Sequence, residues 1–311
     1  MSEQRVVLLA GGTGGGKLAA GMQELLGERL TVVVNTADDL DMHGLRICPD
    51  PDLVTYWLSG VIDEERGWGI RDDGFAASEW LERLGAPGWF SLSDRDLATC
   101  LYRTGLLAEG MSYTEITARI AAALGVRARV LPMCEQRVSA RVRTARGWRE
   151  LQEFLILDRG EGAIEAVELP GVEGARLTPQ AADAVAVADL IVIAPSNPVI
   201  SIGPILAVSG MREAIAAASV PVVAVSPLVG GRSMKGPTEA FIAAEGQPVS
   251  AVGVASIYAG VIDAMVIDET DPDPGPHDLP VLACSTLMND AQSRREVARR
   301  VLDFASGLQR D

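Results

Sequence analysis

Residues 5–17 read RVVLLAGGTGGGK, a short apolar run that ends in a cluster of glycines. A continuous apolar run rich in β-branched residues is typical of a strand buried on both faces of a parallel sheet. After the glycines, Leu18, Met22 and Leu25 recur at helical spacing, and residues 30–34 form a second apolar run. Strand, glycine loop, helix and strand are the first half of a nucleotide-binding domain. The stretch therefore predicts an α/β fold with a Rossmann-like, doubly wound, mainly parallel sheet.

The same pattern returns late in the chain. Residues 190–194 and 220–225 are apolar runs that open into loops rich in proline and glycine. Residues 264–267 and 281–284 supply further candidate strands, and Asn289 is the expected cap of a last helix.

The middle of the chain has a different pattern. It predicts a helix over 94–108 and a second helix opened by a capping box at Ser112 and Glu115. Residues 137–144 and 148–157 alternate like the two strands of a hairpin. We therefore predict a core made of residues 1–61 and 176–311, with a smaller inserted α+β region at 62–175.

Composition excludes several classes of protein. The 311 residues include 27 Lys and Arg against 42 Asp and Glu, a net charge of −15, which disfavours binding to nucleic acid or anionic membranes. The 4 cysteines lie at least 34 residues apart and there are only 2 histidines, so no CxxC or histidine-rich metal motif exists. Apolar runs are short, and we expect a cytoplasmic protein.

The glycine cluster suits an anion. It has the spacing of a phosphate-binding P-loop, but Leu18 replaces the Ser or Thr that would hold magnesium, and Lys17 replaces the third glycine of the dinucleotide fingerprint. Backbone N–H groups and the following helix N-terminus can still face a phosphate. The alternative is a structural strand-to-helix turn. The predicted phosphate-binding residues are Gly11, Gly12, Thr13, Gly14, Gly15 and Lys17.

Carboxylates gather after the second strand. Residues 35–41 and 50–52 hold five aspartates within fifteen residues, next to the predicted phosphate loop. Such a cluster is what a magnesium–phosphate site requires. Asp38, Asp39 and Asp52 are the candidate metal and catalytic residues. The alternatives are that Asp52 only caps a helix over 53–59 and that Asp38 is a solvated loop residue.

Two later loops also suit a ligand. Residues 195–204 place three prolines and a glycine after a buried strand, which exposes Ser196, Asn197 and Ser201 in a rigid arrangement. Hydroxyl and amide groups there suit a base or a ribose. Residues 226–237 form a second glycine-containing loop, in which Lys235 is a candidate for anion binding.

With these motifs assembled, the chain resembles the 2-phospho-L-lactate transferase family, which acts late in the synthesis of the deazaflavin coenzyme F-420. The matching segments run in family order and include GGTGGGKL (11–18), NTADD (35–39), ICPDPDLVT (47–55), RGWG (66–69), DRDLAT (94–99), QEF (152–154) and PSNPVISIGPIL (195–206). The resemblance implies a magnesium-dependent transfer of a phosphorylated three-carbon acid from a guanosine diphosphate-linked donor to the ribityl hydroxyl of a deazaflavin (Fo), with release of GMP. It also implies a homodimer.

The resemblance assigns deazaflavin contacts to Asp52 and Ser91. The family usually carries Lys or Arg at the position of Ser91, so contact with a carboxylate or ring oxygen anion is expected to be weaker here. Gly16 replaces a family Ala or Pro, a change expected only to loosen the loop. The three-carbon acid stays open between 2-phospholactate, phosphoenolpyruvate and 3-phosphoglycerate, and so does the choice of which aspartate acts as base.

A related, non-catalytic group gives the alternative function. UDP-sugar-binding regulators of the gluconeogenesis-factor type have a similar core and carry an ADDGGSSG-like segment after the second strand. This chain reads ADDLDMHG at residues 37–44, and its 195–198 loop also differs. The transferase is therefore the preferred prediction.

Overall fold

The first strand of the chain is the middle of the sheet. In this computed structural model, which describes residues 4–308, β1 (Val6–Ala10) has all five side chains buried. It pairs in parallel with β2 (Leu30–Val34) on one side and with β9 (Leu190–Ile193) on the other. Apolar side chains on both faces of such a strand need a layer of helices above and below.

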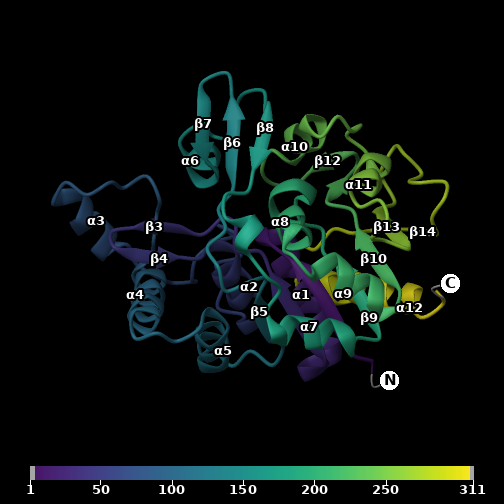
Figure 1. The fold of residues 1–311 in the computed structure, drawn as a ribbon, viewed down its shortest axis with the longest axis horizontal. Coiled ribbons are helices and arrows are strands. Elements are labelled where there is room, and N and C mark those ends of the chain that lie inside the picture. The colour runs from purple at the N-terminus through teal and green to yellow at the C-terminus, as the bar shows by residue number, and fades with distance from the viewer. Residues whose placement is uncertain (1–3, 309–311) are drawn as a thin grey trace.

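The central sheet has seven parallel strands in the order β14-β13-β10-β9-β1-β2-β5 (Figure 1). The remaining members are β5 (Arg129–Pro132), β10 (Val222–Val225), β13 (Ala264–Asp268) and β14 (Val281–Cys284). The chain runs outward from β1 to β2 and β5, then resumes at β9 and runs outward the other way. The strand order therefore reverses between β1 and β9, where open α/β sheets form their ligand crevice. The predicted fold class is confirmed.

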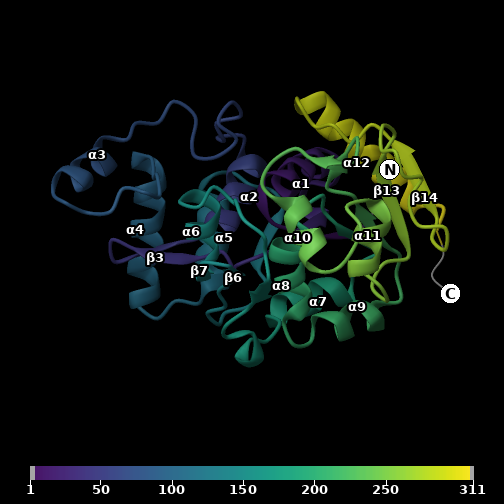
Figure 2. The ribbon, with the colours of Figure 1, turned by 90° about the horizontal axis from the view of Figure 1, so that it is seen from above.

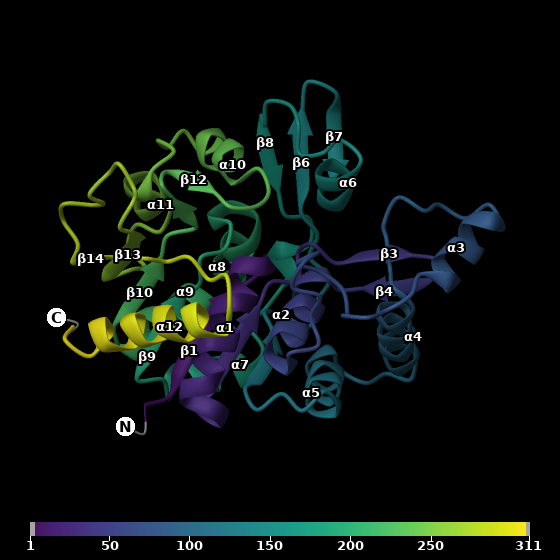
Figure 3. The same cartoon turned by 180° about the vertical axis from the view of Figure 1, so that it is seen from behind.

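Helices cover both faces of the sheet (Figure 2). Alternate residues of β1 separate the two cores: Val6 and Leu8 pack with one set of helices, and Val7 and Leu9 with the other. The first set is α1 (Gly12–Leu26), α2 (Pro49–Ser59), α5 (Tyr113–Ala123) and α12 (Ala291–Ala305). The second set is α7 (Pro179–Ala186), α8 (Gly203–Ala207), α9 (Met211–Ala218), α10 (Thr238–Ala244) and α11 (Ala251–Ile257). Figure 3 shows α12 lying alongside α1.

Smaller units extend from this core (Figure 1). One consists of an antiparallel ribbon and two helices: β3 (Leu40–Met42), β4 (Leu45–Ile47), α3 (Ala76–Arg83) and α4 (Asp94–Ala108). Another is a three-stranded antiparallel sheet with one helix: β6 (Arg141–Thr144), β7 (Gly147–Glu150), β8 (Ala166–Glu168) and α6 (Leu151–Ile156). A short hairpin, β11 (Leu228–Val229) and β12 (Arg232–Ser233), lies in the 226–237 loop.

Several predicted boundaries were wrong. Residues 151–156 form α6 and not the second half of a hairpin strand, because Leu151 and Phe154 are buried at helical spacing. The last helix is capped by Asp290, not Asn289, through a capping box with Ser293. Helix α2 begins at Pro49, so Asp52 lies inside its first turn and does not cap it.

The predicted division into core and insertion stays a prediction, but the central sheet crosses its boundary. Strand β5 lies within 62–175 and pairs with β2 in the main sheet. The capping box at Ser112 and Glu115 and the helix over 94–108 are confirmed. Among the described residues, no helix has both the length and the apolar character that crossing a bilayer requires.

Candidate functional site

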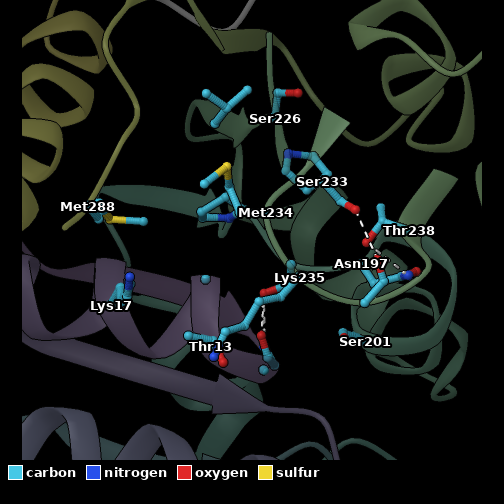
Figure 4. A pocket seen from close by; sticks show the side chains of 18 of the residues that line it. Thr13, Lys17, Asn197, Ser201, Ser226, Ser233, Met234, Lys235, Thr238 and Met288 are labelled. Atoms are coloured by element: carbon cyan, nitrogen blue, oxygen red, sulfur yellow. Dashed lines mark hydrogen bonds between the residues drawn. The ribbon is translucent and has the colours of Figure 1, made fainter. Parts of the chain in front are cut away.

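A cavity of about 330 Å³ opens at the reversal point between β1 and β9 (Figure 4). We call it the crevice pocket. Its walls come from four distant segments: the start of α1, the 195–201 loop, residues 226–238 and residues 286–289. The structure thus brings Gly11, Gly12, Thr13, Gly14, Lys17, Ser196, Asn197, Ser201 and Lys235 together, as the sequence predicted.

Most of the glycine cluster lies in the first turn of a helix and not in a loop, because α1 begins at Gly12. The N–H groups of such a turn have no acceptor within the helix and can bind an anion. Several of the glycines also have packing reasons. A side chain at Gly11 would collide with Asp50, one at Gly14 with the carbonyl of Pro195, and one at Gly15 with Ser196. The packing role of these glycines is therefore observed, whereas anion binding by the turn stays a prediction, and Gly15 does not line the pocket.

Positive charge collects on one side of the crevice pocket. The Lys17 ammonium lies 5.6 Å from the ring centre of Trp57, and the guanidinium of Arg294 lies 5.0 Å from the same ring. Burial, Arg294 and Lys235 lower the pKa of Lys17. Glu64, which pairs with Arg294, acts in the opposite direction. An anionic ligand beside Lys17 would add a negative charge next to Lys17 and Lys235 and so would favour the charged amine.

The 195–201 loop is fixed by its own polar side chains. The Ser196 hydroxyl donates to the carbonyl of Gly11 at 2.6 Å. The Asn197 carbonyl oxygen accepts from the N–H groups of Val199 and Ile200, which caps the π-helical turn at 198–202. These contacts make the loop rigid and leave it as one wall of the crevice pocket.

Two buried carboxylates have no cationic partner among residues 4–308. Asp50 accepts from the N–H of Gly12 at 2.6 Å and from the amide of Asn35 at 2.9 Å. Asp38 accepts from the amide of Gln152 at 3.3 Å, and its Oδ1 is buried without a hydrogen bond. Burial raises the pKa of Asp50 to about 6, and burial together with the charges of Asp50 and Asp39 raises the pKa of Asp38 well above its ordinary value. A cation between Asp38 and Asp50 would remove this repulsion.

The other two predicted metal ligands already have partners. Asp52 forms a buried ion pair with Arg103. Asp39 accepts from the thiol of Cys48 at 3.2 Å and from the hydroxyl of Tyr113 at 3.0 Å, although its Oδ1 is unpaired. Burial raises the pKa of Asp39 to about 7 against the opposing influence of Arg103. The positive charge of Arg103 therefore lies near Asp39 and Asp52, whereas within residues 4–308 no cation pairs with Asp38 or Asp50.

Asp38 and Asp50 could hold magnesium together with the phosphates of a substrate. Within residues 4–308 no three His, Cys, Asp or Glu side chains form a metal-binding group. Magnesium commonly uses one or two carboxylates together with substrate phosphates and water. Asp38 and Asp50 meet that requirement, because Asp50 also contacts the first turn of α1, where a phosphate would lie.

A second cavity, of about 410 Å³, adjoins the start of α2. We call it the aromatic pocket, because Tyr56, Trp68, Trp89 and Phe90 form much of its wall. Carboxylate, hydroxyl and amide side chains share that wall: Asp52, Asp96, Ser91 and Gln152. No lysine or arginine lines this pocket in the described part of the chain. The structure therefore brings Asp52 and Ser91 to the wall of one pocket, and their contact with a deazaflavin stays a prediction.

The first turn of α2 separates the two pockets. Asp50 contacts Gly12 on the crevice side, and Asp52, two residues later, lines the aromatic pocket. Sequence reasoning did not select Asp50, although it stands in the same DPD motif as Asp52. It also missed Asn35, Gln152 and Arg103, whose partners lie far away in the chain.

These features define a Rossmann-like α/β protein with two adjoining ligand pockets. A family profile described as "2-phospho-L-lactate transferase CofD" matches residues 6–280. The chain belongs to the 2-phospho-L-lactate transferase CofD family and is therefore an enzyme of the transferase class.

Curated relatives agree with this assignment, and a solved structure shares the fold. The chain is 41% identical to the 2-phospho-L-lactate transferase of Methanosarcina mazei over 267 residues, which cover 86% of this chain and 88% of the relative. It is 38% identical to the phosphoenolpyruvate transferase of Streptomyces griseus over 312 residues, with 97% and 98% covered. A UPF0052 family protein from Bacillus halodurans shares the fold, with a TM-score of 0.67 at 18% identity, covering 97% of this chain and 99% of that one.

Proposed function

We propose that the protein transfers a phosphorylated three-carbon acid from a guanosine diphosphate-linked donor to the ribityl hydroxyl of the deazaflavin Fo, a step of coenzyme F-420 biosynthesis. One observation carries the proposal: one helical turn holds Asp50, which accepts from the N–H of Gly12 in the wall of the crevice pocket, and Asp52, which lines the aromatic pocket. Two substrates bound in these pockets would meet at the start of α2. The homodimer and the cytoplasmic location expected from the sequence belong to the same proposal.

The donor would occupy the crevice pocket. Its diphosphate would lie over the first turn of α1 and near Lys17 and Lys235, and its guanosine would lie near Ser196 and Asn197. The deazaflavin would stack in the aromatic pocket, beside Asp52 and Ser91.

The reaction exchanges a phosphoanhydride bond of the donor for a phosphate ester bond to the acceptor. The ribityl hydroxyl oxygen attacks the phosphorus that carries the three-carbon acid, the bond from that phosphorus to the bridging oxygen breaks, and GMP leaves with the bonding electrons. The hydroxyl proton passes to a carboxylate, for which Asp39 and Asp52, which do not hold the metal in this proposal, are the candidates. Bound magnesium, held by Asp38 and Asp50, would neutralise charge on the phosphates as GMP departs.

The relatives do not single out one acid. A 2-phospho-L-lactate transferase and a phosphoenolpyruvate transferase are about equally similar to this chain, at 41% and 38% identity. These acids differ by one double bond, a difference that pocket contacts must detect. The proposal therefore covers the class of phosphorylated three-carbon acids.

Release of GMP tests the proposed function. The purified protein is incubated with magnesium and each guanosine diphosphate-linked acid, with and without Fo, and the product mass is recorded. We expect GMP only when Fo is present, and a product whose mass is that of Fo plus the phosphorylated acid less one water. Stabilisation by UDP-sugars, with no GMP released from any donor, would instead support the regulatory alternative.

A further inference from the structure

The turn at residues 63–70, which contains the RGWG motif, lies between the two pockets and has no role in the chemistry described so far. It is held by its own backbone and side chains. The N–H of Gly67 donates to the carbonyl of Asp63 at 2.7 Å, and the N–H of Asp63 donates to the carbonyl of Gly69 at 3.0 Å. Arg66 pairs with Asp63 at 3.0 Å and donates to the carbonyl of Ile70 at 2.8 Å. The turn therefore behaves as one stiff unit.

Two side chains of the crevice pocket are attached to this turn. The ammonium of Lys235 donates to the carbonyl of Arg66 at 3.2 Å. The hydroxyl of Thr13 donates to the next carbonyl, that of Gly67, at 3.4 Å. Thr13 and Lys235 lie side by side in Figure 4. One edge of the turn is thus bound to the wall of the crevice pocket.

The other end of the same turn belongs to the aromatic pocket. Trp68 and Gly69 line that pocket directly after the two bound carbonyls. The Arg66 guanidinium lies 5.3 Å from the ring centre of Trp68, so the indole moves with the turn. Gly67 touches Lys235 so closely that a Cβ there would take the place of the ammonium, and its φ of +72° also favours glycine.

We propose that Thr13 and Lys235 are positioning residues for the acceptor: they fasten the 63–70 turn, and through it Trp68, so that occupation of the crevice pocket strengthens binding in the aromatic pocket. The inference rests on the proposed assignment of donor and acceptor to these pockets. An anionic nucleotide beside Lys235 restricts its ammonium to the position from which it holds the turn. An acceptor that binds afterwards then orders less of the protein and binds more tightly. By linkage, the acceptor strengthens nucleotide binding by the same factor.

The test measures the dissociation constant of Fo by its fluorescence, with and without saturating GDP and magnesium. We expect GDP to tighten Fo binding about tenfold in the unmodified protein. Lys235→Met and Gly67→Ala should reduce this factor to within about twofold of one, even with GDP at saturation. Arg71→Met is the matched control, because Arg71 makes the same kind of contact, from a cation to the carbonyl of Gly60, outside both pockets. A factor of one in the unmodified protein, or a full factor in both variants, overturns the inference.

Hydrogen exchange gives a second measurement that does not need the acceptor. GDP should slow amide exchange at residues 67–69 in the unmodified protein and in Arg71→Met, but not in Lys235→Met. Unchanged exchange on GDP binding contradicts the inference, whatever the acceptor is. If GMP is released in the assay above but the coupling factor is one, the inference fails and the proposed function stands. If GDP protects the turn but no donor yields GMP, the proposed function fails and the link between the crevice pocket and the turn stands.

Discussion

Gly16 shows how a single missing side chain shapes the site. The sequence led us to expect a looser loop at this position. Instead, Gly16 lies within α1, and the indole of Trp57 occupies the space where its Cβ would be. That indole is the ring contacted by both Lys17 and Arg294.

We therefore expect Gly16→Ala to destabilise the protein by about 1–3 kcal/mol, because the added methyl group must displace Trp57. Urea denaturation followed by circular dichroism measures the change. Gly105→Ala is the matched control, since Gly105 lies within α4 with nothing near its missing Cβ, and alanine there should be neutral or stabilising. Equal effects of the two substitutions would contradict the packing argument.

Asp50 is expected to be the carboxylate most sensitive to magnesium. Asp50→Asn should lower the transfer rate by about 10²-fold or more and should weaken the rise in melting temperature that magnesium and GDP together produce. Asp41→Asn provides the control, because Asp41 is an exposed carboxylate of the same cluster, paired with Arg46. An undiminished rate of the unmodified protein in excess EDTA would remove the metal from the proposal.

Ser91 stands in the aromatic pocket where relatives are expected to carry a cation. Ser91→Arg should change the KM for Fo or for the donor by several-fold, because the pocket wall otherwise has carboxylates and no cation. Ser256→Arg adds the same charge at an exposed position on α11 and should leave both KM values unchanged. If the two variants behave alike, Ser91 does not contact either substrate.

At the scale of elements, a buried ion pair joins two helices. Arg103 of α4 is almost completely buried and reaches Asp52 in the first turn of α2. The same guanidinium also donates to the carbonyl of Arg46. Arg46 is the middle residue of β4, the strand that leads into α2. Arg103 thus fixes the peripheral helix α4 against the wall of the aromatic pocket.

Arg103→Met should destabilise the protein by about 3–5 kcal/mol, because it leaves the Asp52 charge buried without a partner. Adding Asp52→Asn in the same chain should recover part of that loss, since the remaining group is then neutral. Denaturant titrations of the single and double variants decide between the outcomes. A double variant less stable than Arg103→Met alone would show that Asp52 contributes through contacts other than the ion pair.

Elements with long periodic patterns could be predicted from the sequence, and short ambiguous ones could not. The β1, α1 and β2 unit and the Ser112 capping box follow from local chemistry. Residues 151–156 alternate well enough to suggest a strand, but burial against the sheet favours a helix there. Local patterns also found the glycine turn and the aspartate cluster. They could not choose Asp50 over Asp52, because that choice depends on Arg103, 51 residues further along the chain.

At the scale of the whole molecule, buried carboxylates make stability depend on pH. Burial raises the pKa of Asp39 to about 7 and the pKa values of Asp50 and Asp96 to about 6. Between pH 4 and 7 the folded chain therefore holds more protons on these groups than the unfolded chain does. The free energy of unfolding should fall as pH rises through this window.

We expect this fall to be on the order of 2 kcal/mol or more without magnesium. Asp96→Asn should make the fall smaller, whereas Asp72→Asn, at an exposed position, should not change it. Chemical denaturation at half-unit steps of pH measures the profile. A stability that rises steadily from pH 4 to 7 would show that these carboxylates are not protonated in the folded state.

The central position of β1 has a consequence for synthesis of the chain. Val6 emerges from the ribosome before its sheet partner Leu190, which is 184 residues later. At about 5–20 residues per second, β1 waits roughly 10–40 s for β9. The crevice pocket closes later still, when residues 286–289 arrive. A ligand that needs all four walls can therefore bind only after residue 289 has been synthesised, and a cell rich in that ligand would preferentially stabilise chains that extend beyond that point.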